Sequence, residues 1–291
     1  MKIVYVILHY IAEKDTIECV ESILKSTKKS EHKTNIIIID NGSTNGSYAE
    51  IKKLFGDEQC VTILHSDRNL GFAKGNNIGF RYAKIYLKAD FIVQLNNDTI
   101  LSQNNFNEIV VRKFEENKYY VLGPDIITAD GLHQNPGNKQ SWSFNELRLY
   151  RLKKRLRIIL SYLFLDHVAT SIIDSSKKVY NFNTILGDIK NTTLHGACLI
   201  FSPLYIRNFD GLYDKTFLYM EEDILKLFSD YYGFLMMYSS ELSIFHKEDI
   251  ATNMAQGSTN QKKRKKYKQL IESSLIYSKL KYKLEKGNNR F

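Results

Sequence analysis

One short polar cluster holds residue types that could bind a metal ion. The apolar run from Asp90 to Leu95 stops abruptly in Asn96, Asn97 and Asp98. A turn alone would explain these residues, because Asn and Asp favour turns through local side-chain hydrogen bonds. A carboxylate here could also hold Mg²⁺, which usually takes one or two protein carboxylates beside phosphate oxygens and water. The positions of the other polar clusters separate the two interpretations.

A second cluster, Glu221-Glu222-Asp223, holds residue types suited to proton transfer. Adjacent carboxylates in a cleft raise each other's pKa, and a raised pKa suits a general base. An acidic first turn also favours a helix through its dipole, so a structural role is compatible with a catalytic one.

The first 95 residues alternate between unbroken apolar runs and amphipathic segments. We expect strands at 3–8, 35–40, 61–65 and 90–95, and helices at 16–26, 48–55 and 73–87. This pattern predicts an α/β fold, with a mainly parallel sheet covered on both faces. Such sheets bind ligands at the carboxyl ends of their strands. Polar clusters follow three of the strands, at 9–10, 40–43 and 96–98, so we expect them to line one crevice.

The pattern is looser after residue 120. We expect strands at 120–127 and 238–246, helices at 144–165 and 216–231, and a buried apolar segment at 194–202. Apolar residues recur at helical spacing in the first of these helices, at Leu149, Leu152, Leu156, Ile159 and Leu163. Residues 166–188 show no clear pattern.

Composition narrows the class of protein. The chain of 291 residues is 43% hydrophobic and 25% charged, as in ordinary globular proteins. Its three cysteines, Cys19, Cys60 and Cys198, are widely spaced, which argues against a disulfide framework or zinc site and favours a reducing compartment. The sequence shows no signal peptide and no apolar run of roughly 20 residues, so we expect a cytoplasmic protein.

The positive charge is concentrated at the C-terminus. Residues 258–291 hold 11 Lys or Arg and 2 Glu, so the net charge of +9 belongs to this segment. Later apolar residues, including Leu270, Tyr277 and Leu280, make it a basic amphipathic helix, typical of binding to an anionic membrane surface. The alternatives are a solvated tail and a helix that pairs in a homodimer. Charge alone would also allow nucleic acid, but the core has no corresponding motif, and we expect none to bind.

Several blocks, in order, resemble family 2 glycosyltransferases, specifically their rhamnosyltransferase-like and galactofuranosyltransferase-like branch. They are the segments 40–47, 69–77, 95–99, 194–200, 211–214 and 217–223, followed by His246. The resemblance covers about residues 1–250. It implies a GT-A (Rossmann-like) domain over 1–250, with a donor half at about 1–125 and an acceptor half at about 126–250. The basic tail, 251–291, would be a helical extension.

The resemblance also implies the chemistry. Members are expected to be inverting enzymes that use Mg or Mn and a nucleoside-diphosphate sugar. The donor here would be a UDP or dTDP sugar. The acceptor would be a saccharide in the synthesis of a bacterial-type surface polysaccharide. One form of this hypothesis has the saccharide linked to a lipid. With the basic tail, this suggests a peripheral protein on the inner face of the cell membrane.

Particular residues match the family blocks. Asp40 can accept a hydrogen bond from the base edge, and Gly42 allows close backbone approach. The predicted nucleotide-sugar contacts are His9, Tyr10, Asp40, Asn41, Gly42, Ser43, Arg68, Asn69, Gly71, Lys74, Asn77, Asn96 and Asn97. The predicted metal ligands are Asp98 and His246, and Asn96 stands where the family often has a carboxylate. Aligning Phe217-Leu-Tyr makes Glu222 the base, whereas counting from Asp214 favours Asp223; we prefer Glu222.

Two other functions fit part of the pattern. A sugar nucleotidyltransferase would also need a metal-binding Asp, but it would carry a Gly-rich basic loop after the first strand, which 9–13 lacks. A nucleotide-sugar-binding or membrane-scaffolding protein that has lost catalysis is compatible with Asn96. The intact acidic cluster at 221–223 argues against it.

Overall fold

The computed structural model describes residues 1–137, 140–162, 183–247 and 259–287. Its first half contains β1 (Lys2–His9), α1 (Glu13–Thr27), β2 (Lys33–Asp40), α2 (Ser47–Phe55), β3 (Val61–His65), α3 (Phe72–Ile85), β4 (Phe91–Asn96), β5 (Thr99–Ile100), α4 (Phe106–Asn117) and β6 (Val121–Thr128). Its second half contains α5 (Phe144–Tyr162), β7 (Asp188–Lys190), β8 (Cys198–Phe201), α7 (Pro203–Asn208), α8 (Glu221–Tyr232), β9 (Met236–His246) and α10 (Thr259–Glu285).

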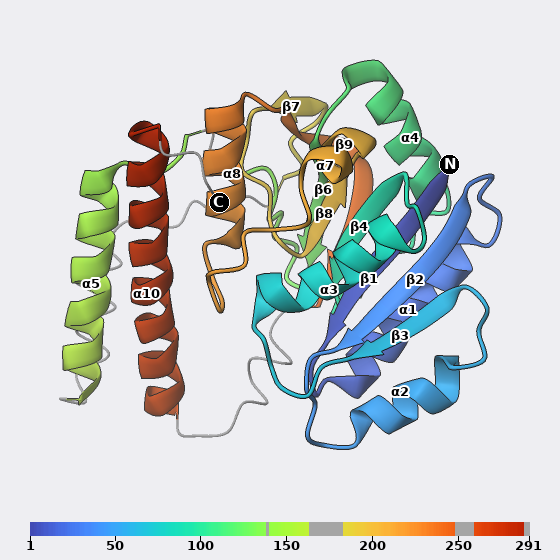
Figure 1. Cartoon of the computed structure of the whole chain (residues 1–291), viewed down its shortest axis with the longest axis horizontal. Coiled ribbons are helices and arrows are strands. Elements are labelled where there is room, and N and C mark those ends of the chain that lie inside the picture. Colours follow the sequence, from blue (N-terminus) through green and yellow to red (C-terminus); the bar gives the residue numbers. More distant parts are fainter. Residues whose placement is uncertain (138–139, 163–182, 248–258, 288–291) are drawn as a thin grey trace.

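The described strands form one mixed sheet in the order β3-β2-β1-β4-β8-β6-β9-β5, with β7 beside β9 (Figure 1). Strands β3, β2, β1 and β4 are mutually parallel, β8 runs antiparallel between β4 and β6, and β6 is parallel to β9. The predicted α/β fold with a mainly parallel sheet flanked by helices is confirmed.

Helices cover both faces of this sheet because the central strands are apolar on both sides. One layer packs α1, α2 and α4 on residues such as Tyr5 and Ile38. The other packs α3 and α7 on residues such as Val6 and Ile39. Burying both faces of a parallel sheet is what unbroken runs of Ile and Val require.

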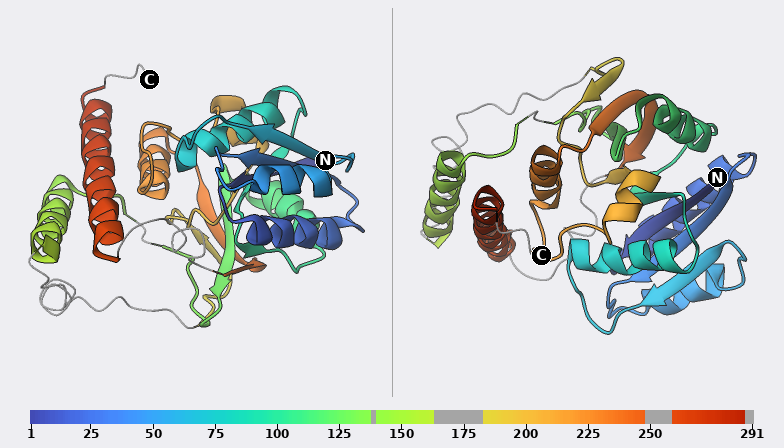
Figure 2. Two further views of the ribbon diagram at one scale, coloured as in Figure 1. Left: turned by 90° about the horizontal axis from the view of Figure 1, so that it is seen from below. Right: turned by 45° about the horizontal axis from the view of Figure 1, so that its top comes forward.

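A third cluster lies away from the sheet, where α5, α8 and α10 meet. It contains Leu147 of α5, Ile224 of α8, and Tyr277, Leu280 and Leu284 of α10, all buried. Figures 1 and 2 show α10 between α8 and α5, with α5 at the outer margin. The predicted C-terminal helix therefore exists, but part of its apolar face is used inside the molecule. The division of the chain into domains at residue 250 stays a prediction.

Helix α8 begins at Glu221, five residues after the predicted start. Tyr219 and Met220 have φ angles of 74° and 68°, and this left-handed conformation cannot continue into a helix. The two residues turn the chain so that the acidic cluster occupies the first turn of α8. The predicted helix at 144–165 is described only to Tyr162.

Candidate active site

The carboxyl ends of four parallel strands lie side by side. In the sheet register, His65 pairs with Asp40, Asp40 with His9, and Leu8 with Asn96. The expectation that the polar strand ends share one edge is confirmed. His65 was not predicted, although its position at the end of the third strand was the available signal.

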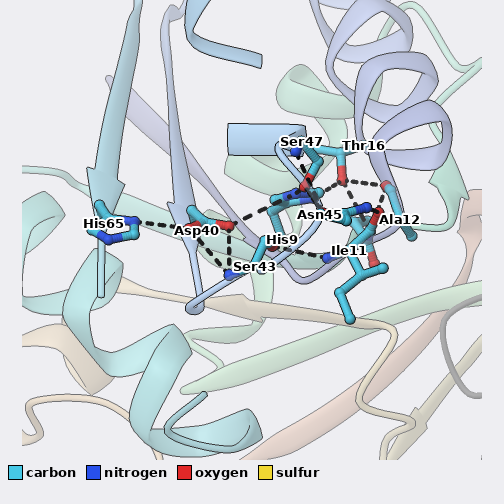
Figure 3. Close-up of polar contacts among 10 residues, drawn as sticks. His9, Ile11, Ala12, Thr16, Asp40, Ser43, Asn45, Ser47 and His65 are labelled. Carbon is cyan, nitrogen blue, oxygen red and sulfur yellow. Dashed lines mark hydrogen bonds and ion pairs between the residues drawn. The ribbon is translucent and has the colours of Figure 1, made fainter. Parts of the chain in front are cut away.

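Asp40 is the centre of a buried polar network at this edge (Figure 3). Its Oδ2 lies 2.8 Å from Nδ1 of His65, and the backbone N–H of Ser43 lies 3.4 Å from both of its carboxylate oxygens. Nε2 of His9 is 3.8 Å from Oδ1. Asp40 is 1% exposed while the side chain of His65 is 40% exposed, so His65 connects the carboxylate with the surface.

The ring of His9 has hydrogen-bond partners on two neighbouring segments. Its ring is fully buried, with Nδ1 2.7 Å from Oγ1 of Thr16 and Nε2 2.8 Å from Oγ of Ser47. Its carbonyl accepts from the N–H of Asn41. Burial lowers the pKa of His9 to about 4, against the opposing effect of Asp40. These internal partners favour a supporting role for the ring of His9, and its predicted contact with a nucleotide stays a prediction.

Two predicted amide contacts also have internal partners. Asn41 donates to Oδ1 of Asn69 at 3.1 Å and accepts from the N–H of Leu70 at 2.9 Å. Asn77 donates to the carbonyl of Leu212 at 2.7 Å and accepts from its N–H at 2.8 Å. Both amides are buried and tie loops together, which favours a role in positioning the site; their contact with a nucleotide sugar stays a prediction.

Three further predicted contacts differ in their accessibility. Oδ1 of Asn69 accepts from the N–H of Gly71 as well as from Asn41, so this side chain also fixes a loop. Lys74 is exposed, whereas Asn77, one turn further along α3, is buried. Arg68 is exposed as well.

Two glycines allow backbone segments to approach closely. Gly42 has φ +75°, and a Cβ there would lie 2.4 Å from the carbonyl carbon of Arg68. Gly71 has φ +85°, and a Cβ there would lie 2.2 Å from the carbonyl oxygen of Phe217. The next residue, Phe72, donates its N–H to that same oxygen at 2.9 Å. The loop at the start of α3 is therefore joined to the segment that leads into the acidic cluster.

The predicted metal ligands lie close together. Among the described residues, Oδ1 of Asp98 has no hydrogen-bond partner although it is buried, and Nε2 of His246 lies 3.2 Å from it. Nδ1 of His246 is 2.7 Å from Oε1 of Gln134, which the sequence did not indicate. The ring of His195 lies 5.8 Å from that of His246, and burial lowers the pKa of His195 to about 4. Within the described ranges, no three His, Cys, Asp or Glu side chains form a metal-binding group by themselves.

Asn96 and Asn97 point in different directions. Asn97 donates to Oγ1 of Thr16 at 3.0 Å, and this hydroxyl also contacts His9, so Asn97 belongs to the supporting network. Asn96 lines a cavity of about 350 Å³. The cavity is lined by Phe72, Asn96, Trp142, Tyr150, His195, Gly196, Ala197, Leu218, Tyr219, Met220, Glu221, Glu222, Asp223 and Leu270. Its size and aromatic lining suit a small-molecule site.

The three acidic residues of α8 have different surroundings. Oε1 of Glu222 accepts the N–H of Gly196 at 3.0 Å, and Oδ1 of Asp223 accepts the indole N–H of Trp142 at 2.7 Å. Oε1 of Glu221 accepts from Thr216 at 2.9 Å. Trp142 was not predicted.

Burial is the main cause of raised pKa values in this cluster. It raises the pKa of Glu222, while hydrogen bonds from backbone N–H groups oppose the rise. Burial and the charge of Glu222 raise the pKa of Asp223 to about 6 and that of Glu221 to about 7. Two of the three carboxyl groups can therefore hold a proton close to neutral pH.

The sequence comparisons identify the family. Residues 5–169 match the family model described as glycosyl transferase family 2, so the chain belongs to this family. The match ends before the acidic cluster and His246. A curated relative, Glycosyltransferase GlyG of Streptococcus pneumoniae serotype 4, is 26% identical over 156 residues. These residues are 47% of this chain and 50% of GlyG, so the match spans half the length of the relative.

Solved structures support the fold. The crystal structure of S. aureus TarS 1–349 matches with a TM-score of 0.51 and 11% identity, covering 94% of this chain and 71% of TarS. TarS 1–349 in complex with UDP-GlcNAc matches with a TM-score of 0.53 and 13% identity, covering 95% and 67% of the two chains. At these identities the likeness concerns the fold alone. The specific branch of the family stays a prediction.

No helix within the described ranges has the length and apolar character to cross a membrane.

Proposed function

We propose that this protein is an inverting glycosyltransferase, which moves a sugar from a nucleoside-diphosphate sugar to a saccharide hydroxyl. The observation that carries the proposal joins the sheet edge to the acidic cluster. Asp40 and Asn96 lie at the same edge of the sheet, and the cavity that Asn96 lines is also lined by Glu222 and Asp223. Family membership supports this reaction. The fold neighbour in complex with UDP-GlcNAc supports a nucleotide-sugar donor.

The donor site is assigned to the strand ends around Asp40. Uracil and thymine both present a ring N–H, which a carboxylate can accept. The donor is accordingly a UDP or dTDP sugar. Arg68, exposed on a loop, and Lys74, exposed in the first turn of α3, are suited to the diphosphate, whereas His9, Asn41 and Asn77 support the loops.

The residues at the end of β9 fit a divalent cation, Mg or Mn. In this proposal Nδ1 of His246 donates to Oε1 of Gln134, since an amide oxygen is an acceptor. Nε2 is then the acceptor that faces Oδ1 of Asp98. Two facing acceptors fit a cation between them, with the remaining ligands coming from diphosphate and water. A bound cation would supply positive charge that stabilises the leaving diphosphate.

Glu222 is the proposed base. Glu222 accepts a hydrogen bond from the N–H of Gly196, the residue after His195. Because the ring of His195 lies 5.8 Å from that of His246, Glu222 is on the side of the proposed metal ligands Asp98 and His246. It removes the proton from the acceptor hydroxyl as that oxygen bonds to the anomeric carbon and the bond to diphosphate breaks. Asp223, held by Trp142 on the aromatic side of the cavity, is the alternative base and otherwise positions the acceptor.

The proposed acceptor is a saccharide of a surface polysaccharide, linked to lipid at the cytoplasmic face of the membrane. The aromatic residues Phe72, Trp142, Tyr150 and Tyr219 line the cavity and could contact sugar faces. The membrane association first attributed to the basic tail requires revision, because Tyr277 and Leu280 are buried against α5 and α8.

Transfer assays with UDP and dTDP sugars, Mn²⁺ and oligosaccharide acceptors would test this function. We expect release of nucleoside diphosphate together with a glycosylated product of inverted anomeric configuration. Glu222→Gln should lose the activity, while the exposed control Glu58→Gln should keep it. Absence of turnover with every donor, or retention of the anomeric configuration, would contradict the proposed reaction.

A further inference from the structure

Helix α5 exposes four aliphatic side chains to solvent. Leu149, Leu152, Leu156 and Ile159 are 53%, 62%, 43% and 56% exposed. Their spacing of three, four and three residues places them in one stripe along the helix. A stripe of this kind normally faces a protein core. Here it needs another explanation, since contiguous exposed apolar surface commonly marks an interaction site.

The opposite face of α5 packs on α10 through the buried Leu147 and through polar contacts. Arg151 donates to the hydroxyl of Ser278 at 2.8 Å, and Arg157 donates to that of Tyr267 at 3.0 Å. Near the end of α5, Arg264 donates to the carbonyl of Ser161 at 3.3 Å. Because these contacts involve the other side of the helix, the stripe points away from the body of the molecule. Figures 1 and 2 both place α5 at the outer margin.

Positive charges lie on both sides of the stripe. Helix α5 has six Lys or Arg residues and a single acidic residue, Glu146. At 100° per residue, Arg148 and Arg155 border one edge of the stripe and Lys153 the other, and all three are exposed. The contact between Arg157 and Tyr267 also brings the basic start of α10 beside the second half of α5. An apolar stripe between cationic edges is the pattern of a helix that lies in a membrane interface.

We propose that the outer face of α5, and not the C-terminal tail alone, binds an anionic lipid bilayer. Charge complementarity selects this occupant, because negative headgroups attract exposed Lys and Arg while the apolar stripe enters the acyl boundary. A second copy of the chain would bring two strongly basic helices together, and like charges across an interface oppose association.

The position of α5 relates this surface to catalysis and rests on the proposed function. Tyr150 of α5 and Leu270 of α10 line the cavity that contains Glu222 and Asp223. The helix that would contact the bilayer is thus also a wall of the cavity. This arrangement favours an acceptor saccharide carried on a lipid, which would enter the cavity from the membrane side.

Vesicle sedimentation of the full-length protein tests the proposal. The vesicles would contain phosphatidylcholine alone, or equal parts phosphatidylcholine and phosphatidylglycerol. We expect binding to the second kind only, weakened by salt and reduced at least tenfold in Leu152→Glu/Ile159→Glu. Arg148→Gln/Arg155→Gln should also weaken it. The control Leu54→Glu changes a similarly exposed leucine (52%) on α2 and should bind like the wild type.

Equal binding by the wild type and the stripe variant would overturn the proposal, as would failure of the wild type to bind anionic vesicles. A dimer that the stripe variant converts to monomer would overturn it as well, since the stripe would then face a second copy. Calorimetric titration of the same variants with UDP measures the donor site independently, so a failure of the membrane surface can be distinguished from a failure of the donor site. Unchanged UDP binding together with lost vesicle binding supports the surface, whatever its role in transfer.

Discussion

Oε1 of Glu222 accepts the backbone N–H of Gly196 at a distance of 3.0 Å, beside the segment that carries His195. A Cβ at residue 196 would lie 2.6 Å from the same oxygen, so a side chain there would displace the carboxylate from this position. The contact holds Glu222 beside His195, whose ring lies 5.8 Å from that of His246, whereas Asp223 is bonded to Trp142.

Glu222→Gln should reduce kcat by about 10² to 10⁴, because the amide cannot take the proton of the acceptor hydroxyl. UDP affinity should stay within about twofold of the wild type, as measured by calorimetry. Asp223→Asn should cost less activity than Glu222→Gln, and mainly through KM for the acceptor. The reverse order of the two variants would assign the base to Asp223.

Stability should depend on pH through Glu221, which is 4% exposed. Its pKa is about 7 in the folded protein against an ordinary 4.5, so the folded state binds more protons between these values. Its contribution is therefore fully present below pH 4.5 and is lost as pH rises through 7, by on the order of 3 kcal/mol. Glu221→Gln should remove this dependence.

Urea unfolding at pH 5 and pH 8 measures the effect. We expect Glu221→Gln to lose less stability than the wild type between the two pH values, while the exposed control Glu285→Gln behaves like the wild type. Identical pH dependence in all three proteins would contradict the raised pKa of Glu221.

Gln134 should orient His246 toward Asp98, because its Oε1 lies 2.7 Å from Nδ1 of that ring. Gln134→Leu should weaken Mn²⁺ binding in the presence of UDP by about 10-fold or more, as loss of partners behind metal ligands commonly does. Electron paramagnetic resonance, which detects free Mn²⁺, would measure this affinity. Gln103→Leu, which removes a different glutamine bonded to β9, should leave the affinity unchanged. Equal affinities in the two variants would show that Gln134 has no such role.

Gly42→Ala should destabilise the fold by about 2 kcal/mol or more, since the new Cβ would meet backbone atoms of Arg68 and Asn69. Gly46→Ala is the matched control. Gly46 also has a positive φ, +82°, but a Cβ there would meet no atom of the described residues within 4 Å. Chemical denaturation should therefore show a smaller loss for Gly46→Ala. Equal losses would mean that backbone strain, and not the close approach, determines the cost.

The strands near the donor site were predictable because their residues are apolar on both faces and their ends are polar. Helix α4 was not predicted. Its buried face includes Asn107, which accepts from the hydroxyl of Tyr5, and Lys113, which pairs with Asp188. Polar residues on an inward face obscure the amphipathic pattern, and their partners lie 102 and 75 residues away in the chain. Sequence spacing contains no information on such partners.

The candidate site was predictable only in part for a related reason. Residue types located the cluster, but they did not distinguish side chains that face a ligand from those that hold loops. Asn77 and Lys74 illustrate this, because one is bonded twice to Leu212 and the other is exposed. Similarly, the apolar spacing of α5 predicted a helix correctly, yet it could not indicate that the stripe faces outward.

The most direct test of the central claim is a calorimetric titration with UDP and dTDP, each with and without Mn²⁺. It would compare the wild type, Asp98→Ala and the exposed control Asp57→Ala. We predict Mn²⁺-dependent binding of at least one nucleotide to the wild type and to Asp57→Ala, with loss of this dependence in Asp98→Ala. Failure of both nucleotides to bind under either condition, or equal Mn²⁺-dependent binding by Asp98→Ala, would contradict the assigned donor and metal site.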